Sequence, residues 1–476
     1  MIAASIVLPL QAQAVSGEVA SHARAGQEAE RRNDFATAVQ EYSYVVAQLP
    51  RSAEMQSNLG IALYFNHELT RALPVLQKAM ALNPELLAPH LFCGLAWYRL
   101  SNPDAAVAEL ETAARLNPSD VIAHTWLGYA YSAQSRYGAA LKEFEAASRL
   151  DPKNIDVEYA LGQMQLEAGK AATLELLGIA PDGGRTWQLA GEQAQLQGDR
   201  QDALADFLGA FQRRPDIAEL PRVISELGGT VSGAVPAPQP RNPQEDVLYQ
   251  RAHEAEQEAR AAFAKVVEIA PASYRAHQIL GDSLTAEQRL EEATGEYRTV
   301  LKLNPDLPGI HESIGKNLLA TGKEAEALEE FQAELEIQPN SATATMYAGE
   351  VLLLMGSDEK ARTMLNRALH LDRPPPETYR CLGKIELHTG NYRGAINELN
   401  HYISVRNSDA SAYYLLSKAY QAVGDKAQMN RALAMFEKTS QNAKARSRVQ
   451  AKLESSVAQN QLSEEKMDLP DSAAHQ

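Results

Sequence analysis

Prolines recur every 34 residues in two stretches of the chain. The first stretch contains Pro50, Pro84, Pro118 and Pro152, and the second contains Pro271, Pro305 and Pro339. A fixed period of this length is typical of an array in which one small supersecondary unit is repeated. Each unit of such an array completes its core only by stacking on its neighbours. We therefore expect a repeat protein rather than a fold with one central core.

Three further positions repeat in phase with the proline. When the proline is counted as residue 32 of a unit, residue 8 is glycine, residue 20 is alanine and residue 24 is a large apolar or aromatic residue. Nine units have these anchors, with glycine at Gly26, Gly60, Gly94, Gly128, Gly191, Gly281, Gly315, Gly349 and Gly383. A glycine costs up to about 1 kcal/mol of helix propensity relative to alanine. Its recurrence indicates places where two helices approach closely.

With these anchors the chain resembles the tetratricopeptide repeat family, whose unit is a helix-turn-helix of the same length. The resemblance covers most of residues 19–407. It implies an all-α fold, a right-handed superhelical solenoid of helix-turn-helix repeats. Small residues such as Gly128 and Ala140 would leave room for the bulk of residues such as Phe144, and the proline would end each second helix.

The repeat is interrupted near the middle of the chain. After Pro152 the second helix of the unit is expected to shrink to about residues 171–177. Residues 226–244 are rich in Gly and Pro without an apolar period, which predicts a linker. Residues 245–269 contain no helix breaker and predict one long helix rather than a hairpin.

These interruptions predict two arrays of repeats. The first would span residues 18–225 and the second residues 245–458, ending in a capping helix over about residues 440–457. The polar residues 459–476 predict a disordered tail. The linker is either a hinge between the arrays or a surface loop on one continuous solenoid.

The first 14 residues, MIAASIVLPLQAQA, form a short apolar run that ends in the small-x-small pattern of Ala12, Gln13 and Ala14. No Lys or Arg precedes the run, so the usual basic start is missing. We interpret residues 1–14 as a signal peptide that has lost this start, which predicts an exported bacterial protein, periplasmic or extracellular. The alternative is that the segment is not a signal and that the protein is cytoplasmic. No later run reaches the roughly 18 apolar residues of a membrane span.

Charge and motifs exclude several function classes. The formal net charge is −16, whereas a nucleic-acid-binding face needs a basic surplus, so we expect no nucleic-acid partner. Cys93 and Cys381 lie far apart and are interpreted as buried apolar residues. The sequence has no phosphate-binding loop, dinucleotide fingerprint, helical zinc-protease motif or nucleophile elbow. We therefore expect neither catalysis nor a cofactor.

Histidine recurs at residue 4 of five units, at His22, His90, His124, His277 and His311. A metal site needs two or more ligands at one ion. Equivalent residues of successive repeats lie about one helix diameter apart, roughly 10 Å. We therefore interpret these histidines as packing residues and expect no metal.

The family resemblance implies that residues 2, 5, 9 and 12 of each first helix line a concave face, with residues 6 and 13 close by. In the first array these positions are apolar or aromatic, at Ile61, Tyr64, Phe65, Leu91, Leu95, Tyr98, Trp126 and Tyr129. An exposed patch of this kind commonly marks a binding site, and we expect its side chains to stand outside the core between the helices. The alternative is that superhelical curvature buries part of it. In the second array the same positions hold Lys316, Arg380, Lys384, Tyr414 and Lys418, which predicts a locally basic groove unless these are ordinary solvated charges.

The leading hypothesis is a non-enzymatic scaffold that binds peptide segments or partner proteins in concave grooves. Two alternatives stay open. The chain could recruit substrates for a separate glycosyltransferase or for envelope polysaccharide or secretion machinery, or it could bind carbohydrate through the Tyr and Trp residues of the first groove. The sequence does not identify the partner.

Overall fold

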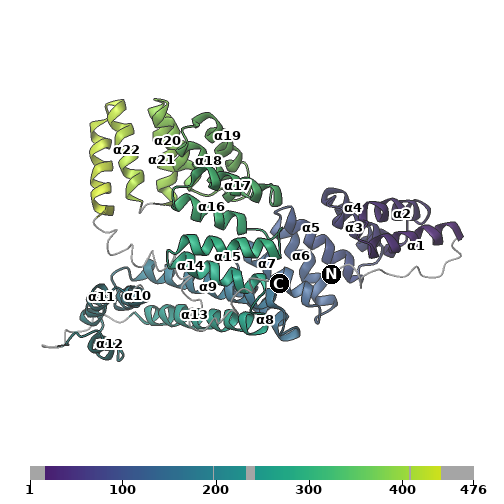
Figure 1. Cartoon of the computed structure of the whole chain (residues 1–476), viewed down its shortest axis with the longest axis horizontal. Helices are drawn as coiled ribbons and strands as arrows, with labels where there is room; N and C mark the ends of the chain where they lie inside the picture. Colours follow the sequence, from purple (N-terminus) through teal and green to yellow (C-terminus); the bar gives the residue numbers. More distant parts are fainter. Residues whose placement is uncertain (1–16, 197, 232–241, 407–408, 441–476) are drawn as a thin grey trace, which may run out of the picture. The chain divides into compact units, whose positions relative to one another are not determined.

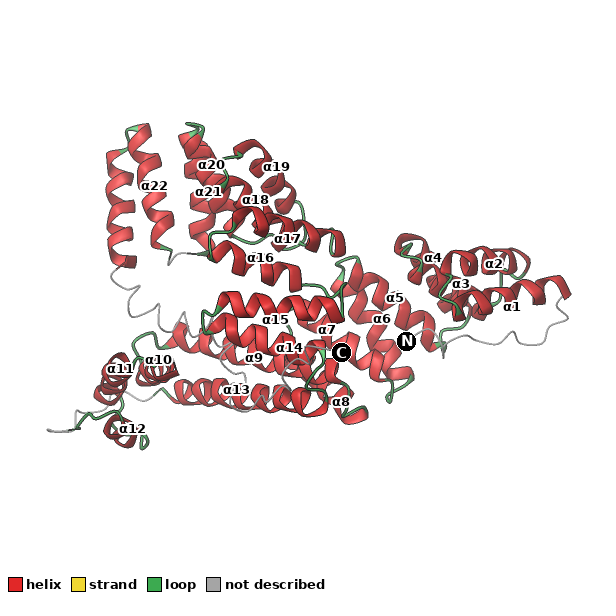
Figure 2. Ribbon diagram, viewed as in Figure 1, coloured by secondary structure: helices red, strands yellow, loops and turns green. Residues whose placement is uncertain are grey.

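The computed structural model describes residues 17–196, 198–231, 242–406 and 409–440. All the regular secondary structure in these ranges is helical (Figure 2). The predicted all-α solenoid of helix-turn-helix repeats is confirmed. The predicted signal peptide, capping helix and C-terminal tail lie outside the described residues, as does most of the predicted linker.

The chain divides into two compact units, Met1–Met164 and Gln165–Gln476. The first unit consists of four helical hairpins and the beginning of a long helix (Figure 1). Its helices are α1 (Gly17–Arg31), α2 (Phe35–Gln48), α3 (Ala53–Phe65), α4 (Leu69–Leu82), α5 (Leu87–Arg99), α6 (Pro103–Leu116), α7 (Val121–Ala133), α8 (Tyr137–Leu150) and the first part of α9 (Ile155–Ile179).

The second unit begins within α9, and its described residues contain five further hairpins that carry the repeat anchors. Its helices are α10 (Gly184–Leu196), α11 (Arg200–Arg213), α12 (Leu220–Glu226), α13 (Pro243–Ile269), α14 (Tyr274–Ala286), α15 (Leu290–Leu303), α16 (Ile310–Ala320), α17 (Glu324–Ile337), α18 (Ala342–Leu354), α19 (Asp358–Leu369), α20 (Glu377–His388), α21 (Tyr392–Val405) and α22 (Ala410–Val423). A last helix spans residues 426–440. The division between the two units falls at residues 164 and 165, whereas the sequence placed the boundary of its arrays at 226–244.

The anchors of the sequence repeat meet inside each hairpin. In all nine units a Cβ added to the glycine would lie 2.5–2.9 Å from the side chain of the large residue 16 positions later. Gly26 faces Tyr42 in this way, and Gly315 faces Phe331. The glycine therefore sets how closely the two helices approach, and the large residue fills the space that the missing side chain leaves.

The turn inside each hairpin needs one residue in the left-handed conformation. In the first unit this residue is not glycine: Asn33, His67, Ser101 and Ser135 have φ of 57–60°. In the second unit glycine takes the same place in several hairpins, for example Gly322 with φ 73°. Asn and Ser tolerate this conformation less well than glycine, so the hairpins are held mainly by packing between their helices.

One prediction about the interruption is wrong. The segment expected to form a short second helix over residues 171–177 instead continues α9, which is a single helix of 25 residues. Gly169, which a turn would use, stays helical because a neighbouring helix approaches it: an added Cβ would lie 3.2 Å from Ala255 and 3.3 Å from the carbonyl oxygen of Ala252.

The neighbour is α13, which is the long helix predicted for residues 245–269 and is confirmed at 27 residues. The end of α9 and the start of α13 share a small core that includes Leu176 and Leu248. Gly169, which precedes Leu176 in α9, lies against Ala255, which follows Leu248 in α13. The two helices therefore run antiparallel. Helix α13 therefore packs on α9 in the place where the sequence predicted a short second helix.

Candidate functional site

The predicted apolar face of the first unit is more deeply buried than the sequence indicated. Ile61, Tyr64, Leu91 and Leu95 are only 6%, 3%, 1% and 2% exposed and belong to the main core of the unit. The expectation that they stand outside the core is wrong, because first helices of successive repeats pack directly on one another: α3 contacts α5, and α5 contacts α7. For these four residues the alternative interpretation of the sequence, that part of the face is buried within the array, is the correct one.

The other four predicted residues are partly buried and pack against the same core. Phe65 stacks on Phe35 with ring centroids 4.9 Å apart, and it also contacts Tyr64 and Phe92 edge to face. Arg99 lies over the ring of Tyr64, 4.9 Å from its centroid. This end of the face is therefore a packed aromatic cluster with one cation covering it.

Tyr98, Trp126 and Tyr129 form a second aromatic cluster, which we call the aromatic triad. Their ring centroids are separated by 5.5 Å, 6.5 Å and 5.6 Å, and the rings are tilted or edge to face. Tyr129 also lies edge to face on the buried Phe144 at 5.0 Å. Three partly exposed rings are thus anchored on the core by a fourth, and they come from the first helices of two successive hairpins.

Burial keeps the hydroxyl groups of Tyr64 and Tyr98 neutral near physiological pH. Burial raises the pKa of Tyr98 above its ordinary value of 10. Burial also raises the pKa of Tyr64, against a smaller opposite effect of Arg99. The aromatic face therefore offers apolar rings and neutral hydroxyl groups, which suits contact with a mostly apolar segment.

In the second unit, two of the predicted basic residues are already paired. The Lys316 ammonium lies 2.5 Å from the Glu312 carboxylate and 5.1 Å from the ring centroid of Tyr347. Arg380 lies 3.2 Å from Glu350. The positive charges of Lys316 and Arg380 are therefore neutralised by Glu312 and Glu350 and contribute little to a basic groove.

The other three predicted residues of this groove are Lys384, Tyr414 and Lys418. Tyr414 is 43% exposed, and the Lys418 ammonium lies 4.7 Å from its ring centroid. Neither Lys384 nor Lys418 forms an ion pair with any residue that the structure describes. The predicted basic groove is therefore limited to α20 and α22, which are the first helices of two successive repeats.

The histidines at residue 4 of their units each meet a glutamate that the sequence analysis did not single out. The Nδ1 atom lies 2.5–2.7 Å from a carboxylate oxygen 19 residues later, in the pairs His22 with Glu41, His90 with Glu109, His124 with Glu143, His277 with Glu296 and His311 with Glu330. Each pair joins the two helices of one hairpin. The glutamates recur at residue 23 of their units, so an alignment of the repeats contained the signal.

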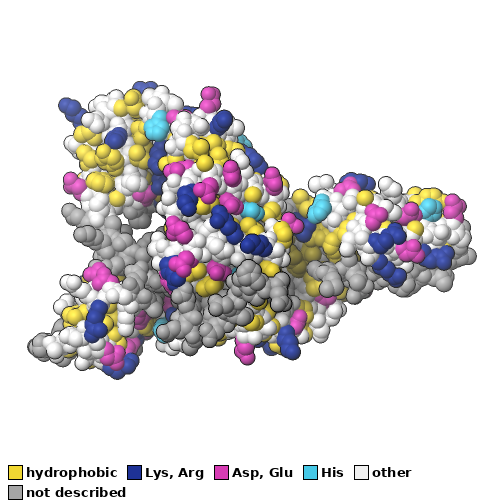
Figure 3. Space-filling model, viewed as in Figure 1, with side chains coloured by type: hydrophobic (Ala, Val, Ile, Leu, Met, Phe, Trp, Pro, Cys, Tyr) yellow, Lys and Arg dark blue, Asp and Glu magenta, His cyan; other side chains and the backbone are white. Residues whose placement is uncertain are grey.

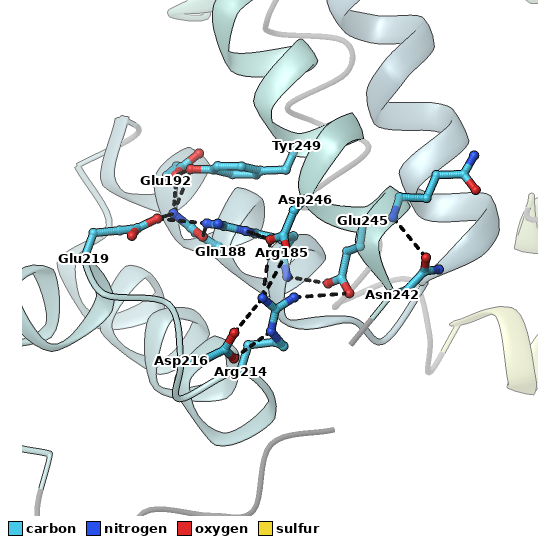
Figure 4. Close-up of polar contacts among 11 residues, drawn as sticks. Arg185, Gln188, Glu192, Arg214, Asp216, Glu219, Asn242, Glu245, Asp246 and Tyr249 are labelled. Carbon is cyan, nitrogen blue, oxygen red and sulfur yellow. Dashed lines mark hydrogen bonds and ion pairs between the residues drawn. The ribbon is translucent and has the colours of Figure 1, made fainter. Parts of the chain in front are cut away.

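A second feature that the sequence did not reveal is an ion-pair cluster in the second unit, with a buried centre and exposed edges (Figure 4). We use this name for Arg185, Arg214, Asp216, Glu219, Glu245 and Asp246. Arg185 donates through Nε to Asp246 and through Nη1 to Glu219, both at 2.8 Å. Its backbone N–H donates to Glu245 at 2.7 Å, near the N-terminus of α10.

Arg214 forms the other half of the cluster. It donates two hydrogen bonds to Asp216, at 2.7 Å and 2.8 Å, and one to Asp246 at 3.2 Å. Its side chain is 4% exposed and that of Glu245 6%. The two arginines thereby fasten α10, α11 and the segment before α12 to the start of α13, and their partners lie on both sides of the predicted linker.

No group of three or more His, Cys, Asp and Glu side chains that could hold a metal ion occurs in the described part of the chain. None of the helices in that part combines the length and apolar character that crossing a membrane requires.

Comparison with known proteins agrees with the repeat geometry. The family described as "Tetratricopeptide repeat" matches residues 24–85, 94–155 and 313–377. No curated protein matches the chain. The fold and the family matches together define an all-α repeat protein that contains tetratricopeptide repeats.

Solved structures of repeat proteins resemble parts of the chain. MamA from Desulfovibrio magneticus RS-1 is 23% identical over 32% of this chain and 85% of that chain, with a TM-score of 0.31. YrrB, described as a TPR protein with an unusual peptide-binding site, is 18% identical over 40% and 97%, with a TM-score of 0.31. The APC/C hetero-tetramer Cut9-Hcn1 is 15% identical over 91% and 96%, with a TM-score of 0.37. These values are too low to transfer a function.

Proposed function

We propose that the chain is a non-enzymatic scaffold that binds a peptide segment of a partner protein on the first-helix face of the first unit. The aromatic triad, Tyr98, Trp126 and Tyr129, is the contact surface. The observation that carries the proposal is that these three rings touch one another, rest on the core and keep part of their surface exposed.

Pre-ordered rings are favourable for binding. Tyr and Trp supply large contact areas, and rings already held by neighbours lose little side-chain entropy when a ligand arrives. Ile61, Leu91 and Leu95 support the rings from within the core rather than touching the ligand. This division revises the predicted site: the aromatic triad contacts the peptide, and the buried residues hold the helices that position it.

The test uses a photo-crosslinking amino acid at Tyr129 in the full chain, expressed in its native source, followed by mass spectrometry. A recovered peptide is then titrated against Trp126→Ala and Tyr129→Ala, with Trp fluorescence as one readout. Loss of one aromatic anchor should weaken binding by about 1–3 kcal/mol, which raises Kd roughly 5- to 150-fold. Tyr392→Ala, which removes a 38% exposed ring in the second unit, is the matched control.

Unchanged affinity in both triad variants, with native circular dichroism, would contradict the proposal. Glycan and peptide arrays probed in parallel separate protein recognition from carbohydrate recognition, and binding to glycans alone would also contradict it. Export is part of the same proposal, based on the apolar run before Ala14. N-terminal sequencing of native protein should begin at Val15, and intact cytosolic protein starting at Met1 would exclude export.

A further inference from the structure

Two lysines on successive first helices of the second unit have no ion-pair partner among the residues that the structure describes. Lys384 is at residue 9 of its repeat on α20, and Lys418 is at residue 9 of the next repeat on α22. Helices α20 and α22 are in contact. Lys384 is partly buried and Lys418 is exposed. In Figure 3, hydrophobic side chains gather over the region of α22 and the helix of residues 426–440, with basic side chains among them.

The carboxylates around this surface have other partners. Glu350 pairs with Arg380. Glu377 lies 3.5 Å from Arg406. Asp409 accepts hydrogen bonds from the Tyr402 hydroxyl at 2.8 Å and from the Ser411 hydroxyl at 2.6 Å. Lys384 and Lys418 therefore keep their positive charges without a carboxylate partner among the described residues, on a chain whose formal net charge is −16.

The other acidic residue of α20 is also occupied. Glu386 pairs with Arg362 and accepts a hydrogen bond from the Asn391 side chain at 2.6 Å. Beside the two lysines, Tyr414 offers an exposed ring on which the Lys418 ammonium rests. The surface therefore combines two positive charges with one aromatic platform.

We propose that this surface binds an internal acidic segment of a partner protein in an extended, polyproline-II-like conformation. Residues in equivalent places on successive repeats lie about 10 Å apart, one helix diameter. A polyproline II helix rises about 3.1 Å per residue with three residues per turn, so carboxylates at positions i and i+3 share one face roughly 9 Å apart. Two such carboxylates match Lys384 and Lys418, and an apolar residue between them can contact Tyr414.

The acidic remainder of the chain adds selectivity. Like charges elsewhere on the protein disfavour an acidic segment, so this surface is where such a segment meets a favourable potential. The proposal concerns the second unit and a charged ligand, and it stands independently of the aromatic triad in the first unit. Either proposal can fail without the other.

The experiment uses the full chain and three fluorescent peptides with amidated C-termini, measured by fluorescence polarisation. One contains the sequence Glu-Pro-Pro-Glu, the second has the same composition as Glu-Pro-Glu-Pro, and the third replaces both Glu by Gln. Lys384→Gln and Lys418→Gln are the test variants. Lys360→Gln on α19 is the matched control, because Lys360 is exposed and lies on a second helix.

The i, i+3 peptide should bind more tightly than its isomer and than the Gln peptide. Each test variant should weaken binding of this peptide about two- to fivefold, and the double variant should weaken it more. Lys360→Gln should leave the affinity unchanged. The differences between variants should shrink as the salt concentration rises. Equal binding of the two isomers, binding unchanged by the double variant, or binding that requires a free C-terminal carboxylate would each overturn the proposal. Circular dichroism melts that match the unmodified chain verify that the variants are folded.

Discussion

Gly128 on α7 faces the ring of Phe144 on α8 so closely that a Cβ on Gly128 would lie 2.9 Å from the ring. Phe144 is fully buried, so its ring cannot swing out into solvent without disturbing its neighbours. The same relationship recurs in all nine described hairpins that carry the repeat anchors. It explains why a residue that weakens an isolated helix is retained in the middle of nine helices: the lost propensity is offset by close helix packing.

Gly128→Ala is therefore expected to destabilise the first unit, because overpacking by the added methyl group costs about 1–3 kcal/mol and outweighs a gain in helix propensity of up to about 1 kcal/mol. Gly138→Ala on α8 is the matched control, since a Cβ there meets nothing within 4 Å. That variant should be unchanged or stabilised by up to about 1 kcal/mol through helix propensity. Urea unfolding followed by circular dichroism measures both, and equal stability of the two variants would refute the packing argument.

The buried part of the first-helix face gives a second prediction. Leu95 is 2% exposed, so Leu95→Ala should lower the free energy of unfolding by roughly 2–5 kcal/mol through lost burial and a cavity. Leu354→Ala, at a site 57% exposed, should cost far less. Thermal melts compare the two variants. Equal melting temperatures would mean that Leu95 is not a core residue.

The sequence predicted the hairpins well because their anchors repeat: one glycine, one alanine and one large residue fix each unit. It failed where a contact joins segments that the period does not relate. The predicted short helix over residues 171–177 does not form, because α9 continues through Gly169, on which Ala255, far along the chain, packs. Likewise, the period shows that Leu91 and Leu95 share a helix face, but burial of that face depends on how tightly successive first helices pack, which the spacing alone does not specify.

A buried carboxyl group makes the first hairpin sensitive to pH. Glu30 is 5% exposed, and its burial raises the pKa to about 7, while a hydrogen bond from the Tyr42 hydroxyl at 3.0 Å acts in the opposite direction. A carboxyl whose pKa is raised on folding contributes stability that is present below its unfolded pKa of about 4.5 and is lost as the pH rises through about 7. The protonated form is the one that the folded hairpin favours.

Glu30→Gln should therefore match the unmodified chain near pH 4.5 and stabilise α1 and α2 at pH 8.5, by up to about 3 kcal/mol. Hydrogen exchange of these helices, compared between the two proteins at each pH, isolates the effect from the rest of the array. Glu28→Gln is the matched control, because it makes the same substitution at an exposed position of α1. Equal protection of Glu30→Gln and the unmodified chain at pH 8.5 would contradict the interpretation.

The ion-pair cluster should decide how firmly the start of α13 is attached to α10 and α11. Burial alone would raise the pKa of Asp246, but hydrogen bonds from Arg185 and Arg214 outweigh it and hold the pKa below its ordinary value. A carboxyl whose pKa is lowered on folding contributes stability above its unfolded pKa, and this stability is lost as the pH falls through the folded value. Attachment of α13 should therefore weaken in acid below about pH 4.

Removing one partner tests the same cluster at neutral pH. Arg214→Ala leaves the carboxylates of Glu245 and Asp246 buried with less compensation, which should cost roughly 3–5 kcal/mol. Arg222→Ala breaks the exposed pair with Glu226 and should cost less than about 1 kcal/mol. Hydrogen exchange should show faster opening at the start of α13 in Arg214→Ala only. Equal exchange there in the two variants would show that the cluster does not fasten α13, and that the apolar contacts of α13 with α9 suffice.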